Sequence, residues 1–218
     1  MKIVIAGAGE VGTHLAKMLS QENQDIILMD PNEERLKFTN NMEVLAMVGN
    51  PTSLKDLQES GVKDADLFIS VTPEEPTNIT ACMLAHSLGA HKTLARINNY
   101  EYLQPKNIEF FQKLGISSMI YPEMLAAREI VTAVQRPWAR QYWELFGGAL
   151  ILIGVKVRDN APIVNKRLTD LSLDQKLYHI VAIKRCNETI IPRGTDHIAS
   201  GDIVFFTTTR EHVKEVQI

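Results

Sequence analysis

Short apolar runs and amphipathic stretches alternate along the first 135 residues of the chain. The apolar runs have the length of strands and contain few polar positions, which is typical of parallel strands buried on both faces of a sheet. The stretches between them favour helices. We therefore expect strands at Lys2–Ala6, Asp25–Met29, Val44–Val48, Leu67–Val71, Thr93–Ile97 and Ser118–Tyr121, and helices near residues 11–20, 33–40, 53–60, 76–88, 107–114 and 123–135.

This alternation predicts an α/β domain, because right-handed crossovers between parallel strands give a doubly wound sheet. The pattern changes at Pro137, which ends the last of these helices. Beyond it strands dominate, and the prediction is a doubly wound α/β domain at residues 1–137 followed by a small α+β domain at 138–218. In the second domain we expect strands at 149–157, 178–185, 188–192 and 202–207, a hairpin turn at Asn187-Glu188, and short helices at 168–175 and 209–217.

Composition and charge narrow the class of protein. The 218 residues are 45% hydrophobic and carry a net charge of −3, which gives no basic footprint for nucleic acid. The apolar run Ala149–Val155 is far shorter than the ~20 residues that a membrane helix needs. The two cysteines, Cys82 and Cys186, lack CxxC spacing, which fits a reducing cytoplasm. No histidine stands at ligand spacing from a cysteine or an acid, so no metal site is expected.

A glycine-rich turn, Gly7-Ala8-Gly9-Glu10-Val11-Gly12, joins the first expected strand to the first helix. In this context the pattern is typical of the Rossmann phosphate-binding turn. Gly7 permits the tight turn, Gly9 allows a phosphate to approach the backbone, and Gly12 lets helix and strand pack closely. The amide groups and the dipole of the helix N-terminus then favour an anion.

Asp30 is the expected ribose-binding acid. It ends the second strand 18 residues after Gly12, near the ~20 that separate such an acid from the turn. Asp30 would accept hydrogen bonds from the ribose hydroxyls and repel a 2′-phosphate, so NAD(H), ATP or ADP are favoured over NADP(H). The alternative is that Asp30 only caps the next helix, before Pro31.

Further candidates stand at the carboxyl ends of other strands, where ligands of such sheets bind. Asn50 follows the third strand, Thr72 and Pro73 follow the fourth, and Arg96 ends the fifth. Arg96 lies in an apolar run, where an unpaired charge is costly. A bound phosphate, which we favour, or a carboxylate partner would explain its position.

Several segments share an order and spacing with a known family. They are Met1–Gly12, Asp30, Asp66–Thr72, Glu75–Asn78, Ala95–Ile97 and Tyr121–Glu123, and in the tail Ile191–Gly194 and Gly201–Phe206. Together they resemble the regulator-of-K⁺-conductance (RCK) family, and in particular the TrkA-type and Ktr-type peripheral subunits of bacterial potassium uptake. The tail is similar to the TrkA-C domain of that family.

The resemblance implies a cytoplasmic regulator that is not an enzyme and lies at the inner face of the plasma membrane. Such a regulator binds NAD(H) or ATP/ADP and gates a TrkH- or KtrB-like potassium-conducting subunit, as a homodimer or a higher ring. TrkA proteins commonly hold two such units in tandem, and this chain holds one, so a half-length piece and a single-unit subunit both fit. The site carried over comprises Gly7, Ala8, Gly9, Glu10, Val11, Gly12, Asp30, Asn50, Thr72, Pro73 and Arg96, with Asn50 where the family often has Asp or His.

Two other functions stay open at this point. An NAD-dependent oxidoreductase shares the fold, and Tyr102 and Lys106 have the Tyr-x-x-x-Lys spacing of short-chain dehydrogenases. Pro105 between them disrupts the single helix that this chemistry needs. A third interpretation makes residues 138–218 the sensor of a small ligand or ion. Four apolar residues there could form a core or an interface: Trp138, Trp143, Leu145 and Phe146.

Overall fold

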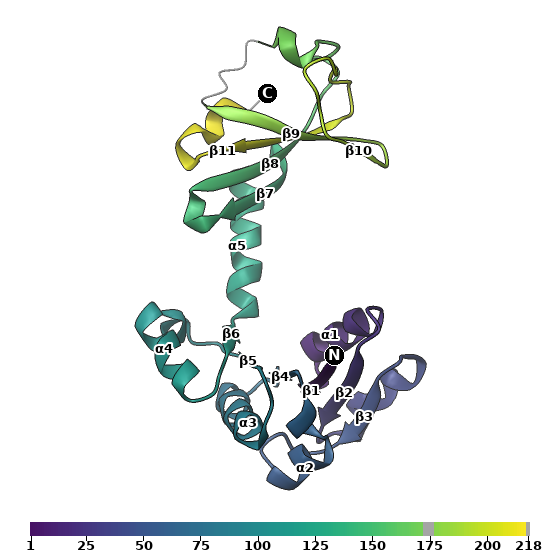
Figure 1. The fold of residues 1–218 in the computed structure, drawn as a ribbon, viewed down its shortest axis with the longest axis vertical. Helices are drawn as coiled ribbons and strands as arrows, with labels where there is room; N and C mark the ends of the chain where they lie inside the picture. The colour runs from purple at the N-terminus through teal and green to yellow at the C-terminus, as the bar shows by residue number, and fades with distance from the viewer. Residues whose placement is uncertain (172–176, 217–218) are drawn as a thin grey trace. The chain divides into compact units, whose positions relative to one another are not determined.

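The chain folds into two compact units (Figure 1). The computed structural model describes residues 1–171 and 177–216. The first unit is Met1–Ala126 and the second is Ala127–Ile218, so the division falls inside helix α5 (Pro122–Gln135). The boundary expected between residues 137 and 138 follows the C-terminal end of the same helix and stays a prediction.

The first unit is built on a six-stranded parallel sheet with the order β3-β2-β1-β4-β5-β6. The central strand β1 pairs with β2 on one side and β4 on the other, so the strand order reverses between β1 and β4. This order confirms the predicted doubly wound sheet and puts its switch point at the end of β1. The strands are β1 (Lys2–Ala6), β2 (Asp25–Asp30), β3 (Leu45–Val48), β4 (Leu67–Ser70), β5 (Thr93–Arg96) and β6 (Ser118–Ile120).

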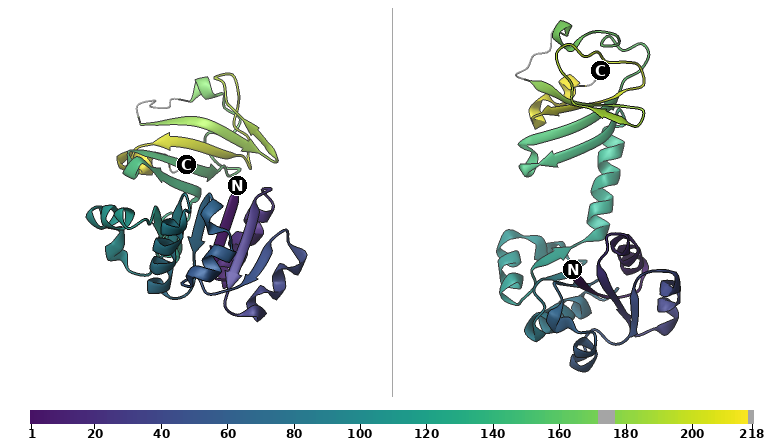
Figure 2. Two further views of the ribbon diagram at one scale, coloured as in Figure 1. Left: turned by 60° about the horizontal axis from the view of Figure 1, so that its bottom comes forward. Right: turned by 45° about the vertical axis from the view of Figure 1, so that its right-hand side comes forward.

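Helices cover both faces of this sheet (Figures 1 and 2). On one face, Val4 and Phe68 are buried with residues of α2, α3 and α4. On the other face, Ile5 and Leu28 are buried with residues of α1 and η1. The helices are α1 (Glu10–Ser20), α2 (Leu54–Glu59), α3 (Glu75–Leu88) and α4 (Pro105–Lys113), and the 3-10 helices are η1 (Glu33–Asn41), η2 (Val62–Asp64) and η3 (Tyr100–Leu103).

The second unit holds a five-stranded antiparallel sheet with the order β10-β9-β11-β8-β7. Side chains on one face of it, such as Ile151, Ile153 and Phe206, form a separate buried core. This sheet and its 3-10 turns confirm a small second domain of the expected class. Its elements are β7 (Ala139–Leu145), η4 (Phe146–Gly148), β8 (Leu150–Lys156), η5 (Leu168–Asp170), β9 (Tyr178–Arg185), β10 (Glu188–Ile190), β11 (Ile203–Thr208) and η6 (Arg210–Val216).

The second unit differs from the sequence prediction in two details. Strand β7 was not expected. None of its side chains is fully buried, and a strand without a buried face shows no clear apolar alternation in its sequence. The hairpin turn is Cys186-Asn187 rather than Asn187-Glu188, because Glu188 already pairs with Arg185. Cys186 takes a φ of +52° in that turn. Of the helix expected at 168–175, the described part contains the 3-10 helix η5, and residues 172–175 lie outside the described residues. Of the helix expected at 209–217, the described part contains the 3-10 helix η6, and residue 217 lies outside the described residues.

An ion pair between a buried aspartate and a half-buried arginine links two segments of the second unit. Asp202, which precedes β11, is 1% exposed, and the Arg185 guanidinium donates to both of its oxygens, over 2.9 and 2.8 Å. Burial would raise the pKa of Asp202, but the hydrogen bonds from Arg185 and from the Ala199 N–H hold it below its ordinary value. Asp202 therefore stays ionised and ties the end of β9 to the turn before β11.

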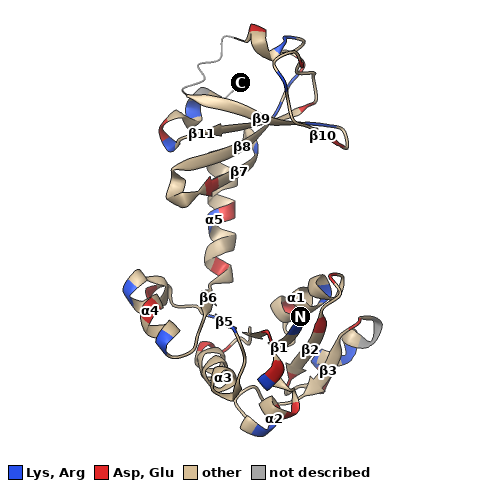
Figure 3. Cartoon of the chain, in the orientation of Figure 1, with Lys and Arg blue, Asp and Glu red and all other residues tan. Residues whose placement is uncertain are grey.

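Charged residues of both signs occur in both units (Figure 3). The ribbon of α5 is mostly uncharged in this view, and none of its residues is buried. Within the described part of the chain, no helix is long and apolar enough to cross a membrane.

Candidate functional site

The glycine turn, residues 7–12, lies at the switch point of the sheet. Gly7 has a φ of +103°, and a Cβ built on it would stand 2.9 Å from the Thr72 nitrogen, so this position requires glycine. A Cβ built on Gly12 would stand 1.8 Å from the Gly7 carbonyl oxygen. The first and last glycines therefore let α1, β1 and the loop after β4 approach one another closely.

Gly9 has a different role. Its φ of −75° is open to any residue, and a Cβ built there meets no atom within 4 Å. Gly9 is also the N-cap of α1, and it supplies no side-chain cap. The amides of residues 9–12 donate to no backbone acceptor among the described residues, as is usual for the first turn of a helix. The turn thus presents unpaired N–H groups beside open space, which is the geometry of an anion-binding site.

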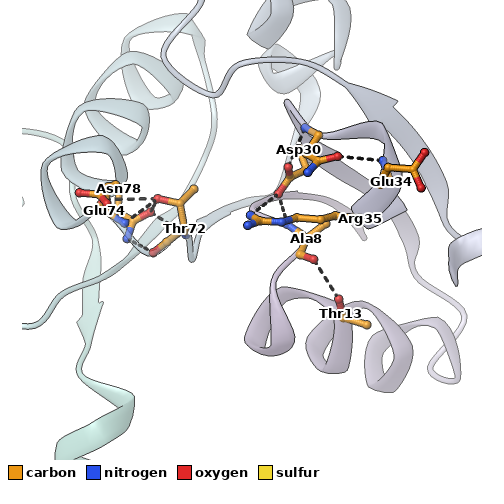
Figure 4. A network of polar contacts seen from close by, with 9 residues as sticks. Ala8, Thr13, Asp30, Glu34, Arg35, Thr72, Glu74 and Asn78 are labelled. Atoms are coloured by element: carbon orange, nitrogen blue, oxygen red, sulfur yellow. Dashed lines mark hydrogen bonds and ion pairs between the residues drawn. The ribbon is translucent and has the colours of Figure 1, made fainter. Parts of the chain in front are cut away.

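Asp30 lies at the end of β2 with only 2% of its surface exposed (Figure 4). One carboxylate oxygen accepts the Ala8 N–H at 2.8 Å, and the other accepts the Asn32 N–H at 2.8 Å. The cap of η1 is Asn32, which accepts the Glu34 N–H, so Asp30 is not that cap. Each oxygen of an ionised carboxylate keeps a further lone pair for a ligand hydroxyl. The carboxylate is therefore held against the glycine turn, and its role toward ribose stays a prediction.

Arg35, which was not predicted as a site residue, lies beside Asp30. Its guanidinium lies 3.8 Å from an Asp30 oxygen, and its side chain is half exposed. In NADP-binding Rossmann domains, an arginine near this position accommodates the 2′-phosphate. In the sequence, Arg35 was marked only by its position five residues after Asp30. The structure places it on η1. Arg35 therefore offsets part of the repulsion that Asp30 exerts on a 2′-phosphate.

Asn78 is a second residue whose role only the structure shows. It is 1% exposed in the first turn of α3, and its Oδ1 accepts from the Ser70 hydroxyl and from the Thr72 N–H and hydroxyl. Its Nδ2 donates to the Thr72 and Arg96 carbonyls, over 2.9 Å each. Figure 4 shows its contacts with Thr72. Asn78 thereby fixes the ends of β4 and β5 relative to each other, which positions two of the expected site residues.

The loop after β4 and the loop after β5 are held in the same region. Thr72 is half-buried beside Gly7, and Pro73, which follows it, is exposed. The Glu75 carboxylate accepts the N–H groups of Asn98 and Asn99, over 2.6 and 2.8 Å, and so fixes the loop after β5.

Arg96 is paired with a carboxylate in this structure. Its guanidinium forms an ion pair with Glu123, in the first turn of α5. Hydrogen bonding by the backbone N–H of Glu123 is the largest influence on that residue's pKa, and with Arg96 it holds the pKa below its ordinary value. The structure thus provides the carboxylate partner that we gave as the alternative, and the phosphate contact stays a prediction.

Asn50 uses its polar groups locally. Its Oδ1 accepts the Thr52 N–H and hydroxyl, and its own N–H donates to Asp56. The preceding Gly49 N–H donates to the Asp30 carbonyl over 3.2 Å, which places this loop beside the end of β2. Asn50 is exposed there, and its contact with a ligand stays a prediction.

The Tyr-x-x-x-Lys spacing does not form one helical face. Tyr102 lies in η3, whereas Pro105 begins α4 and Lys106 follows it in that helix. The Tyr102 ring packs on Phe111, with 4.8 Å between the ring centroids. Among residues 1–171 and 177–216, no group of three or more His, Cys, Asp or Glu side chains could hold a metal ion.

The strand order 3-2-1-4-5-6, the open glycine turn at its switch point and the buried acid after β2 define a Rossmann-type nucleotide-binding protein. Comparison with known families is more specific, since residues 3–122 match the TrkA-N domain and residues 152–217 match the TrkA-C domain. The chain belongs to the TrkA-N/TrkA-C family, as the resemblance in its sequence suggested.

Individual relatives agree with this assignment. The Trk system potassium uptake protein TrkA of Halomonas elongata is 34% identical over 99% of this chain and 48% of its own length. The chain thus spans about half the length of the curated relatives it matches. Among solved structures, the GsuK RCK domain aligns with 99% of this chain and 46% of its own at 16% identity and a TM-score of 0.62. The GsuK channel bound to NAD aligns with 97% of this chain and 38% of its own at 16% identity and a TM-score of 0.61.

Proposed function

We propose that this chain is a regulatory, nucleotide-binding part of a potassium uptake system and not an enzyme. The observation that carries the proposal is the glycine turn, with its unpaired amides, open Gly9 and adjacent Asp30, in a member of the TrkA-N family. Relatives named as Trk potassium uptake proteins support the system, and a fold neighbour described as bound to NAD supports the ligand class. In this proposal residues 1–137 hold the nucleotide, and the protein lies on the cytoplasmic side of the membrane beside a TrkH- or KtrB-like subunit.

Arg96 suggests how a nucleotide would act. We infer that the phosphates occupy the glycine turn, that Asp30 holds the ribose, and that a phosphate competes with Glu123 for the Arg96 guanidinium. Glu123 belongs to the first turn of α5, the helix that contains the boundary between the two units. Release of Glu123 would therefore change the restraint on that helix. A ligand shifts a conformational equilibrium only by its difference in affinity between the two states, so NADH and ATP would differ in effect only through such a difference.

Potassium flux tests this function. The regulator and its membrane subunit would be reconstituted in liposomes, and flux measured without nucleotide and with NADH or ATP. We expect flux to differ between these conditions, and to lose that dependence when Gly9→Val fills the open space above the turn. Equal flux in all conditions would overturn the proposal, and sustained NADH oxidation with a simple carbonyl substrate would favour the oxidoreductase instead.

The ligand preference is a separate prediction. NADH at a hundredfold excess over its Kd should add about 2.7 kcal/mol of stability, measured as a thermal shift, and NADPH should give the smaller shift because Asp30 faces the 2′-position. The Arg35→Gln variant should reduce the NADPH shift further and leave the NADH shift unchanged. Lys37→Gln is the control, since Lys37 pairs with the exposed Glu34 and with no other acid among the described residues. A larger shift with NADPH than with NADH would contradict the assignment of Asp30.

We also propose that the protein is a homodimer. On the α1 face of the sheet, an apolar groove of about 720 Å³ is lined by Leu67, Ile69, Leu94 and Ile120 beside α1. Helix α5 carries Ile130, Val131 and Val134 at helical spacing, and they are 64%, 50% and 74% exposed. One chain thus presents both an apolar groove and an apolar helical stripe. We infer that the α5 stripe of a second copy fills the groove, and reciprocally, as in an isologous dimer.

Sedimentation velocity checks the dimer. Met18 lines the groove from α1 and is 68% exposed, so Met18→Glu should leave the fold intact and give a monomer, as should Ile130→Glu on the stripe. Gln21→Glu adds the same charge just after α1, outside the groove lining, and should leave the dimer unchanged. The same oligomeric state in wild type and all three variants would exclude this interface.

A further inference from the structure

The second unit contains a basic pocket that the nucleotide site does not involve. It has a volume of about 460 Å³ and lies where β7 begins, β8 ends and the turn before β11 approaches them. Two backbone hydrogen bonds hold these segments together: the Val157 N–H donates to the Asp202 carbonyl at 2.8 Å, and the Gly201 N–H donates to the Val157 carbonyl at 3.0 Å. The ion pair between the buried Asp202 and the half-buried Arg185 anchors the same turn. The walls of the pocket are therefore part of a fixed backbone framework.

Three cations line this pocket: Arg140, Lys156 and Arg158. Their side chains make no hydrogen bond or ion pair with any of the residues that the structure describes. The pocket also contains one acid, Asp159, and its carboxylate accepts a hydrogen bond from the Ser200 hydroxyl. The chain as a whole carries a net charge of −3, so this concentration of positive charge runs against its overall composition.

The backbone places these cations together in a specific way. Lys156 ends β8 on the face opposite the buried Val155, and Arg158 follows two residues later. Arg140 stands at the irregularity of β7, where the register with β8 shifts between Ala139 and Gln141. Such a bulge turns a side chain out of the regular strand alternation. Like charges around one concavity repel each other unless an anion lies between them.

We propose that the basic pocket binds a phosphorylated small molecule through its phosphoryl group. Arginine side chains suit this role because their planar guanidinium groups bind phosphate oxygens in pairs, and Lys156 adds a point charge. The half-buried Trp138 forms an apolar wall, so the pocket can cover more of a ligand than its phosphate. Its volume falls in the range of about 300–1,000 Å³ that is usual for small-molecule sites. Free phosphorylated metabolites and the headgroups of anionic lipids both carry such a phosphoryl group.

Isothermal titration of the full chain with pyrophosphate and with ribose 5-phosphate tests whether the pocket binds a free phosphorylated metabolite. Flotation with phosphatidylglycerol vesicles, compared with flotation with phosphatidylcholine vesicles, tests whether the pocket binds the headgroup of an anionic lipid. In the triple variant Arg140→Gln, Lys156→Gln, Arg158→Gln we expect binding of the phosphorylated probe to weaken by about a hundredfold, because charge-assisted hydrogen bonds are lost. The control variant Lys166→Gln, Lys184→Gln, Arg193→Gln makes the same change of charge at exposed sites elsewhere in this unit and should bind like wild type.

The outcomes separate cleanly. If the triple variant alone loses binding of a probe, the result supports the site, and the probe that is lost shows whether the ligand is a free metabolite or a lipid headgroup. Equal binding by wild type, triple variant and control, or no binding of any probe by wild type, overturns it. The far-ultraviolet circular dichroism and the melting temperature of the triple variant should equal those of wild type, which shows that the second unit, with its own core, is folded and keeps this test independent of the proposed nucleotide site.

Discussion

Replacement of Gly12 by alanine is expected to destabilise the first unit by more than about 4 kcal/mol, an exceptional loss for one methyl group. The new Cβ would lie 1.8 Å from the Gly7 carbonyl oxygen and 3.3 Å from a methyl group of Val71. The obstructing atom is backbone, so it cannot move aside as a flexible side chain would. Helix α1 would have to move away from β1, although its buried Ala16 belongs to the core on that face of the sheet. Urea unfolding followed by circular dichroism measures the change.

Gly9→Ala is the matched control within the same turn. Gly9 has an ordinary φ, and a Cβ built on it has no atom within 4 Å. We therefore expect the free energy of unfolding of the variant to stay within about 0.5 kcal/mol of wild type. Its methyl group points into the space where phosphates are expected, so NADH affinity should fall by about tenfold, a change of about 1.4 kcal/mol. Similar stabilities for the two alanine variants would show that the close approach at Gly12 is not what requires glycine.

Replacement of Asn78 by alanine is expected to lower the free energy of unfolding by about 3–4 kcal/mol, which is the second large effect. The amide accepts three hydrogen bonds and donates two, and its loss leaves the Thr72 N–H and the Thr72 and Arg96 carbonyls without this partner. Each buried group left unsatisfied costs about 1–3 kcal/mol. Because the same bonds position Thr72 and Arg96, NADH affinity should fall as well. Chemical unfolding and NADH titration of the purified variant measure the two effects.

Asn107→Ala provides the comparison. Asn107 is half-buried in α4, and its side chain donates one hydrogen bond, to the Glu101 carbonyl at 2.8 Å. Its loss should cost about 1 kcal/mol and leave nucleotide binding unchanged. An Asn78→Ala variant no less stable than Asn107→Ala would mean that the Asn78 network does not hold the ends of β4 and β5 together.

Much of the first unit was predictable because its signals are local. Buried parallel strands such as Ile3–Ala6 are continuous apolar runs, and a glycine turn between a strand and a helix has few other uses. The second unit was less predictable where burial is weak, as in β7, whose exposed side chains leave no clear pattern. The hairpin was misplaced by one residue because Cys186 adopts a positive φ that its residue type does not favour.

The sequence by itself determined the succession of strands and helices in the first unit, its doubly wound α/β class, and the two residues, Gly7 and Asp30, around which the candidate site is built. Only the tertiary structure decided what surrounds them. It placed Arg35 against Asp30, paired Arg96 with Glu123 across 27 residues, and joined Asn78 to the ends of two strands. It also gathered Arg140, Lys156 and Arg158 around one pocket. The physical reason is that periodicity and turn chemistry depend on neighbours in the chain, whereas ion pairs and buried hydrogen bonds depend on which distant segments the sheets bring together.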